Sequence, residues 1–344
     1  MTPETTDKPS GTIWGAFIAD ALAMPVHWYY DRNALVRDYG RITTYKEPHN
    51  PHPDSILWRS SYTPLNEQGD ILHDQARYWG QRGVHYHQFL KAGENTLNYQ
   101  LGLTLLDLLT ASGNYDANDY LKRYIDFMLT PGRHRDTYVE EYHRDFFSAY
   151  ARGVKPRKCG KEDIHIGGLA HVPILAACLS HDLLPTLRAR VQEHVSLTHR
   201  SPSVLSAADT LTRILHAVFN GQPLRNAIQT IATNWFSLRR AEQWSTQPDD
   251  AVIGYQLSPA CYIDDAFPAS LYLAWKYADD FAGGVIANAM VGGDNCHRGA
   301  VVGSLLGAAA GYGRLPEHLV DGLRCAPELR SRMQLTPVRS APSC

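Results

Sequence analysis

Four glycines spaced four residues apart place the tightest limit on how this chain can fold. Gly299, Gly303, Gly307 and Gly311 fall in GAVVGSLLGAAAGYG, with mostly alanine, valine and leucine between them. Residues four apart share one face of an α-helix, so the glycines form a smooth groove against which another helix can pack closely. Each glycine costs about 1 kcal/mol of helix propensity relative to alanine. We therefore expect a helix over residues 298–312 that is buried against a tight neighbour.

Helical patterns also dominate the rest of the chain. GTIWGAFIADALAMPVHWYYD begins at Gly11 and is apolar on nearly all sides, which is typical of a central helix, and Pro25 marks its end. We find neither a strand–helix alternation nor a repeat, so the sequence predicts an all-α fold. Apolar residues recur with a helical period in 96–109, 117–129, 136–152, 169–180, 202–220, 223–236, 266–279 and 280–291.

The helical patterns set the expected domain organisation. We expect a single domain over residues 11–325, between a disordered tail (1–10) and a polar C-terminal tail (326–344). Residues 33–88 lack a long period and form an irregular insertion. A long irregular segment within a compact domain usually covers or shapes a site.

Composition narrows the class of protein. The formal net charge is −2 and the six cysteines include no CxxC pair, which favours reduced thiols in the cytoplasm. The N-terminal MTPETTDKPS is not a signal peptide, and no run of 18 apolar residues could span a membrane. We expect a small-molecule or ribosyl substrate as the partner, with no nucleic acid and no membrane.

Four stretches in the right order carry a family resemblance. They are GTIWGAFIADALAMPVHW, GENTLNYQLGLTLLDLL (93–109), YIDDAFPASLYLAW (262–275) and GGDNCHRGAVVGSLLGAAAGYG. From about residue 11 to about residue 325 the chain resembles the ADP-ribosylglycohydrolase family, which includes the dinitrogenase-reductase-activating glycohydrolases and the J1 crystallins. The resemblance implies an all-α bundle.

The resemblance also implies a metal site that this chain has altered. The resemblance implies two magnesium ions, which members of the family hold with a Thr-Asp-Asp motif and an Asp-x-Asp-Thr motif. At the corresponding positions this chain has Gly93-Glu94-Asn95 and Asp294-Asn295-Cys296-His297. Magnesium prefers several oxygen ligands, and only two carboxylates remain. We expect no binuclear centre and at most a single weakly held divalent ion such as Mg²⁺. Asp, Cys and His would suit a softer ion such as zinc, but they would need partners from elsewhere in the chain.

The two remaining carboxylates are the predicted catalytic pair. Two carboxyl groups can cleave a glycosidic bond without metal, and if the two helix starts meet, Glu94 and Asp294 lie near each other. Their repulsion and burial would raise one pKa, as an acid catalyst requires. The alternatives are a helix-dipole partner for Glu94 and an N-cap for Asp294.

Neighbouring polar residues are the predicted substrate-binding set. Asn95, Thr96, Asn295 and His297 would hold sugar hydroxyls, although His297 could instead bond a backbone carbonyl. Cys296 joins the set, with a small buried hydrophobe as the alternative. Arg298 would clamp a ligand carboxylate or phosphate, or pair with Asp294.

Residues elsewhere complete the candidate site. Asp265 matches an aspartate of the family motif but is equally an N-cap, and His171 falls at a substrate-side loop of the family, where a core or boundary histidine is the favoured reading. Trp28 and Tyr30 would stack on a flat ligand or pack in the core, and the 85–87 HYH stretch is more typical of a solvated strand edge than of a pocket wall.

Together these features predict a divergent hydrolase that cleaves a glycosidic bond to a ribosyl or nucleotide-like group without the two-magnesium centre. Two alternatives remain open: an enzyme of altered chemistry on another small molecule, and a non-catalytic ligand-binding or structural protein like the J1 crystallins.

Overall fold

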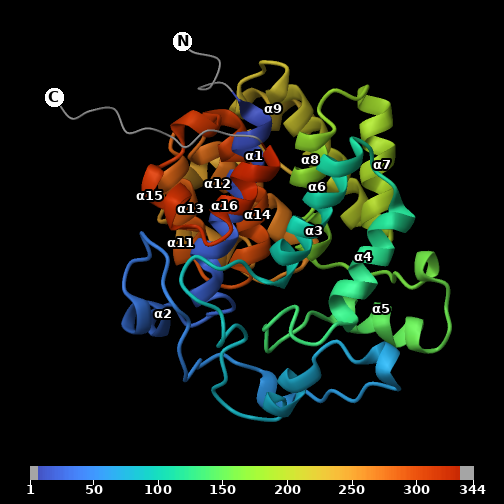
Figure 1. Ribbon diagram of the computed structural model, residues 1–344. Coiled ribbons are helices and arrows are strands. Elements are labelled where there is room, and N and C mark those ends of the chain that lie inside the picture. The colour runs from blue at the N-terminus through green and yellow to red at the C-terminus, as the bar shows by residue number, and fades with distance from the viewer. Residues whose placement is uncertain (1–6, 334–344) are drawn as a thin grey trace.

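The computed structural model describes residues 7–333, and this part of the chain is helical without a β-strand, as the sequence predicts (Figure 1). Between the helices only isolated bridges occur, such as that of His165 with Tyr262. The α-helices are α1 Lys8–Ala23, α2 Arg32–Tyr39, α3 Leu97–Ser112, α4 Ala117–Leu129, α5 Glu141–Ala151, α6 Val172–Cys178, α7 Leu184–Ser196, α8 Pro202–Phe219, α9 Leu224–Ile231, α10 Leu238–Ser245, α11 Asp249–Ala251, α12 Ile263–Lys276, α13 Phe281–Met290, α14 Asn295–Ala310, α15 Glu317–Gly322 and α16 Ala326–Met333.

Helices α1 and α14 form the centre of the fold, and their glycines pack directly against one another. A Cβ at Gly303 would collide with the carbonyl oxygen of Gly15, and one at Gly15 with that of Gly303. Gly307 and Gly11 exclude each other's Cβ in the same way. This confirms the tight neighbour that the glycine spacing predicts.

The other helices surround this pair. Helices α12 and α13 pack on α14, while α6 packs on α1 and in turn contacts α7 and α8. In Figure 1, α6, α7 and α8 lie on one side of the central pair and α12, α13 and α15 on the other. Helix α5 and the segment from residue 40 to residue 95 form the remaining end.

The expected tails need correction where the structure describes them. Residues 8–10 belong to α1, because Asp7 accepts a hydrogen bond from the N–H of Ser10 (3.0 Å) and so caps the helix earlier than expected. Residues 326–333 form α16, whose Leu329 is buried. Residues 1–6 and 334–344 lie outside the described part, so the predictions for them stand as predictions.

The segment 33–88 contains most of α2 and three short 3₁₀ helices, Leu57–Arg59, Glu67–Gly69 and His73–Tyr78.

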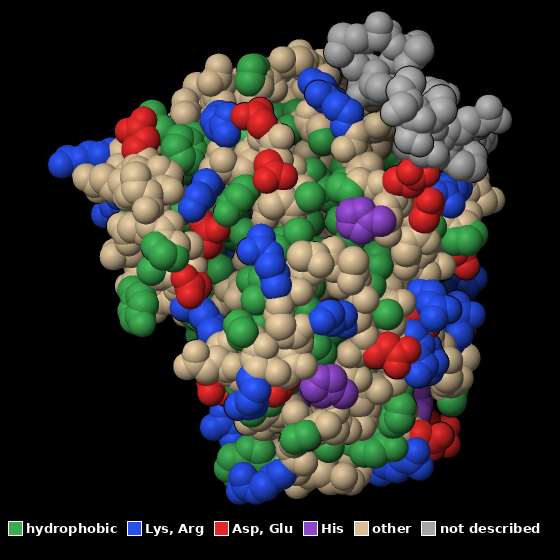
Figure 2. Space-filling model, turned by 90° about the vertical axis from the view of Figure 1, so that its left-hand side faces the viewer, with side chains coloured by type: hydrophobic (Ala, Val, Ile, Leu, Met, Phe, Trp, Pro, Cys, Tyr) green, Lys and Arg blue, Asp and Glu red, His purple; other side chains and the backbone are tan. Residues whose placement is uncertain are grey.

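Over the face shown in Figure 2, basic and acidic side chains are interspersed. Among residues 7–333, no helix is both long and apolar enough to cross a membrane.

Candidate functional site

A glycine pair before α14 brings separate segments of the chain together. Gly292 and Gly293 have φ values of 67° and 64°, a left-handed conformation that glycine adopts freely. A Cβ on Gly292 would meet the carbonyl oxygen of Tyr29, and one on Gly293 that of Pro259. Trp28 donates its N–H to the carbonyl of Gly293 (2.8 Å), and Gly293 donates to that of Tyr29 (2.7 Å). These contacts fix the start of α14 beside the segment that follows α1.

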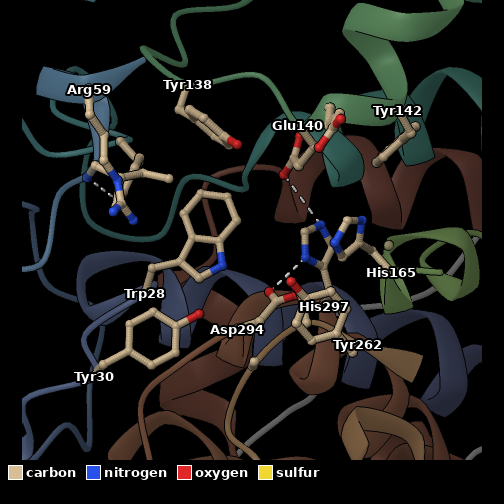
Figure 3. Close-up of a pocket in the computed structure, with 16 residues that line it drawn as sticks. Trp28, Tyr30, Arg59, Tyr138, Glu140, Tyr142, His165, Tyr262, Asp294 and His297 are labelled. Carbon is tan, nitrogen blue, oxygen red and sulfur yellow. Dashed lines mark hydrogen bonds and ion pairs between the residues drawn. The ribbon is translucent and has the colours of Figure 1, made fainter. Parts of the chain in front are cut away.

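A cavity of about 420 Å³ lies beside this junction. Trp28 extends into it from a left-handed φ of 61°, a conformation that costs roughly 1–3 kcal/mol in a bulky residue and is concentrated at functional sites. The rings of Tyr86 and Tyr138 lie nearly perpendicular to its indole ring and pack against it. The aromatic walls comprise Trp28, Tyr30, Tyr138, Tyr142 and Tyr262 (Figure 3), together with Tyr86.

The floor of the cavity is an imidazole ring between two carboxylates. Nδ1 of His297 donates to Oδ1 of Asp294 (2.7 Å), and its Nε2 lies 3.4 Å from Oε1 of Glu140 (Figure 3). Burial opposes charge on all three groups, but their mutual attraction prevails. It raises the pKa of His297 well above its usual range, holds the pKa of Asp294 far below its usual range and lowers the pKa of Glu140 to about 2. The mutual attraction therefore favours the charged forms of all three groups.

A second histidine reaches Asp294 from behind the floor. Nε2 of His27 lies 3.0 Å from Oδ1 of Asp294, and its Nδ1 lies 2.7 Å from Nε2 of His87. Nδ1 of His87 in turn contacts Asp136. Burial lowers the pKa of each of these two histidines to about 4 and raises the pKa of Asp136 to about 8. Four buried side chains thus form one continuous chain of contacts.

Glu94 does not share this floor. It lines a separate cavity of about 300 Å³, where its two carboxylate oxygens accept hydrogen bonds from Nη2 of Arg135 (2.6 and 2.7 Å). One oxygen also accepts the N–H of Lys91 (2.8 Å). The predicted pairing of Glu94 with Asp294 is therefore wrong, because Arg135 and the turn before α3 hold the carboxylate elsewhere. Glu140 is the carboxylate that accompanies Asp294.

Asn95 and Thr96 turn toward the core instead of into the aromatic cavity. The Asn95 amide donates to Asp20 (2.8 Å) and to the carbonyl of Phe17 (2.8 Å). Thr96 donates its hydroxyl and its N–H to the same aspartate (2.7 and 2.9 Å). Burial raises the pKa of Asp20 to about 6 despite these bonds. The predicted sugar ligands therefore tie the start of α3 to α1.

Asn295 and Cys296 are also internal. Asn295 donates to the carbonyls of Val26 (3.2 Å) and Ala289 (3.0 Å). Cys296 is buried, and burial raises the pKa of its thiol well above the usual range. The structure places neither side chain on the wall of the aromatic cavity, and Cys296 has the surroundings of a small buried hydrophobe.

Arg298 is fully buried and holds the glycine turn. Its Nη2 donates to the carbonyls of Gly292 (2.7 Å) and Asn288 (3.1 Å), and its Nε donates to Oδ1 of Asn288 (2.9 Å). Neither of the two expected partners, a ligand anion or Asp294, is needed to account for these bonds. Arg298 instead shapes the backbone that presents Asp294.

The two remaining candidates lie away from the cavity floor. Asp265 is half-buried in the first turn of α12 and does not line the aromatic cavity. His171 lines a small cavity and bonds the carbonyl of Asn98 (2.8 Å) and Nε2 of His194 (3.1 Å). Its environment is that of a boundary histidine.

The sequence analysis missed residues that only tertiary packing brings to the site. Glu140 sits in a stretch without a recognisable motif, and His27 and Asp136 carried no signal. His87 belongs to the HYH stretch, whose histidines are buried and not at a solvated strand edge. The abundance of histidine was the available signal, since eleven of the sixteen are buried or line one of these cavities: His27, His52, His85, His87, His134, His143, His165, His171, His194, His199 and His297.

The residues present do not fit two magnesium ions. At the two positions that the family uses, Glu94 is bound to Arg135, Asn95 is bound to Asp20, and Asn295 is bound to backbone carbonyls. Of the residues at these positions, only Asp294 brings a carboxylate to the floor, where imidazole nitrogens accompany it. Magnesium demands an octahedron of oxygen ligands. The side chains at these positions do not supply enough oxygens for two such ions.

Comparisons with known proteins identify the relatives of this chain. The family model described as ADP-ribosylglycohydrolase matches residues 1–340. No curated protein sequence matches the chain. One solved structure, named "ADP-ribosylglycohydrolase-related protein complex", is similar with a TM-score of 0.64 and 20% identity, over 96% of this chain and 97% of that chain. At that identity the likeness shows the fold alone.

Proposed function

This chain belongs to the ADP-ribosylglycohydrolase family, and from that premise we propose that it hydrolyses a glycosidic bond to a ribosyl or nucleotide-like group without the family's two-magnesium centre. The family is hydrolytic, which supports the class of reaction. The proposal for this chain concerns the substrate class and the residues that act.

One observation carries the proposal: Asp294 and Glu140 contact opposite nitrogens of His297 at the floor of a cavity with aromatic walls. Cleavage of a glycosidic bond needs two carboxyl groups on either side of the reacting centre. The imidazole of His297 lies between these two carboxylates, so a sugar and an attacking water would bind on the cavity side of that ring.

The two carboxylates would have different tasks. Oε2 of Glu140 is buried without a hydrogen-bond partner in the described part of the chain, so as an ionised carboxylate it is free to accept a proton from an attacking water. Asp294 holds His297 in place, and its Oδ2 likewise has no partner among residues 7–333. It places negative charge near the sugar, which becomes positive in an oxocarbenium-like transition state.

The walls favour a nucleotide-like substrate. The rings of Trp28, Tyr30 and Tyr138 offer flat apolar surfaces to a base or another planar group. Arg59, at the end of the 3₁₀ helix Leu57–Arg59, also lines the cavity (Figure 3). A guanidinium suits a phosphate, because its planar donors can bond two oxygens at once.

The test is product release from ADP-ribosylated peptide, ADP-ribosyl serine and simple nucleosides, followed by chromatography. We expect the wild type to release a free ribosyl or nucleotide product from at least one of them, and Asp294→Asn to lower kcat by at least about 100-fold. A folded wild-type protein that binds these compounds without cleaving them would contradict the proposal and favour a ligand-binding protein.

A further inference from the structure

Three buried side chains bring ligand atoms close together at the cavity floor. Nε2 of His27, Nδ1 of His297 and the carboxylate of Asp294 lie within 4.8 Å of one another. Their fractional exposures are 0, 5 and 1%. We propose that these three residues bind a single divalent transition-metal ion of the zinc class.

The donor set selects the kind of ion. Two imidazole nitrogens and one carboxylate oxygen suit Zn²⁺, Fe²⁺ or Co²⁺, whereas Mg²⁺ prefers oxygen throughout. The site differs from the family's centre in the number of ions and in the ligand atoms. His27 also lies outside the two motifs that hold magnesium in the family, and it is the partner from elsewhere in the chain that zinc requires.

The surroundings of the two histidines match those of metal ligands. A metal-bound histidine usually engages its second ring nitrogen with a carboxylate or another acceptor, which fixes the ring. The second nitrogen of His297 contacts the side-chain amide of Asn98 and lies 3.4 Å from Glu140. That of His27 lies 2.7 Å from His87, which is itself held by Asp136. Both rings are therefore fixed with one nitrogen aimed at Asp294.

The spacing needs only a small adjustment to admit an ion. Donor atoms at ~2.1 Å from zinc in a tetrahedron lie ~3.4 Å apart. The two histidine nitrogens now lie 3.0 and 2.7 Å from Oδ1 of Asp294. Oδ2 of Asp294 is buried and has no partner among residues 7–333, so a turn of the carboxylate supplies an unused oxygen.

The cavity supplies an open coordination position. Asp294 and His297 line the cavity and His27 lies behind them. An ion held by these three ligands would face the cavity with its fourth position, as in zinc sites that keep a place for water or substrate. The inference rests on the ligand geometry and does not depend on the proposed reaction.

The experiment is titration of the chelator-treated full chain with Zn²⁺ by calorimetry and with Co²⁺ by visible absorption. We expect one ion per chain and a Co²⁺ spectrum typical of four or five ligands including imidazole. His27→Asn and His297→Asn should each weaken Zn²⁺ binding by more than about 100-fold. Asp136→Asn, which removes a supporting contact, should weaken it by about 10–100-fold.

His165→Asn is the matched control, because His165 lines the same cavity outside the cluster and should leave the Zn²⁺ affinity unchanged. Thermal unfolding provides a second readout: Zn²⁺ should raise the Tm of the wild type and of His165→Asn, and should not raise that of folded His27→Asn. If a variant does not fold, the stoichiometry and the Co²⁺ spectrum of the wild type still show whether the chain binds one ion through imidazole ligands.

Absence of one-to-one binding in the wild type would overturn the inference, as would unchanged affinity in folded His27→Asn and His297→Asn. A failure of the metal site can be distinguished from a failure of the proposed function. Stoichiometric binding without any hydrolysis would contradict the proposed reaction alone, and hydrolysis by a chain that binds no ion would contradict the metal site alone.

Discussion

The carboxylate of Asp294 accepts a 2.7 Å hydrogen bond from Nδ1 of His297, three residues later in the first turn of α14. Asp294 occupies the N-cap position, yet its side chain makes no capping bond within the described part of the chain. The left-handed turn at Gly292 and Gly293 directs it toward the cavity instead. The residue that sequence alone could explain as a helix cap thus belongs to the polar floor.

The glycine contact between α1 and α14 predicts the effect of adding one methyl group. Gly303→Ala should improve helix propensity by about 1 kcal/mol, but its Cβ would collide with the carbonyl of Gly15 and the Cβ of Ala19. We expect a net destabilisation of about 1–3 kcal/mol, measured by urea unfolding. Ser304→Ala on the same helix should cost at most about 1 kcal/mol, since its hydroxyl bonds only Val301. A more stable Gly303→Ala would disprove the close packing.

The role of Arg298 predicts a difference between two positively charged residues. Lysine cannot reproduce bonds from Nε and Nη2 to three different acceptors. Arg298→Lys should therefore lower the free energy of unfolding by about 2–4 kcal/mol, because buried carbonyls lose their donors. Exposed Arg314→Lys should leave it nearly unchanged. Equal stability of the two variants would show that Arg298 does not hold the glycine turn.

His165 and Asp163 predict a pH dependence of stability. Nδ1 of His165 bonds Asp163 at 2.8 Å, and this contact, together with one to Cys261, raises the pKa of His165 to about 10. A raised pKa means that the folded chain binds the proton more tightly than the unfolded chain. The stabilisation is therefore complete below about pH 6.5, the ordinary imidazole value, and is lost as the pH rises through about 10.

Asp163→Asn tests that dependence. Urea unfolding should show the variant to be less stable than the wild type at pH 6 by about 1 kcal/mol, a value reduced for partial exposure of the pair. The gap should narrow above pH 10. His199, which lies 3.4 Å from Asp163, is neutral at these pH values because burial lowers its pKa to about 4. A gap that stays constant with pH would contradict the assignment.

The periodicity of apolar residues in the sequence predicted the helices well where the apolar face of the helix is buried in the fold. The predicted helix over 117–129 coincides with α4, and the glycine spacing located the central helix pair. Helices α2, α7, α10, α15 and α16 were missed, and of these only α16 falls in the stretch expected to be a polar tail.

The site was only partly predictable, because its residues meet through tertiary structure. Asp294 and His297 lie on one helix turn and could be found together. Glu140 approaches from the start of α5, and no spacing in the sequence relates it to α14. Glu94 occupies a position that the resemblance assigns to the magnesium site, but Arg135, which is distant in the sequence, takes its carboxylate.

The central claim, that the aromatic cavity with Glu140 at its floor is where the reaction occurs, is tested most directly by comparing two matched variants. Glu140→Gln and Glu94→Gln each replace a carboxylate by its amide, one in each cavity. On a substrate that the wild type cleaves, Glu140→Gln should lower kcat by at least about 100-fold while Glu94→Gln keeps activity within a few-fold. Loss of activity in folded Glu94→Gln with retention in Glu140→Gln would contradict the account.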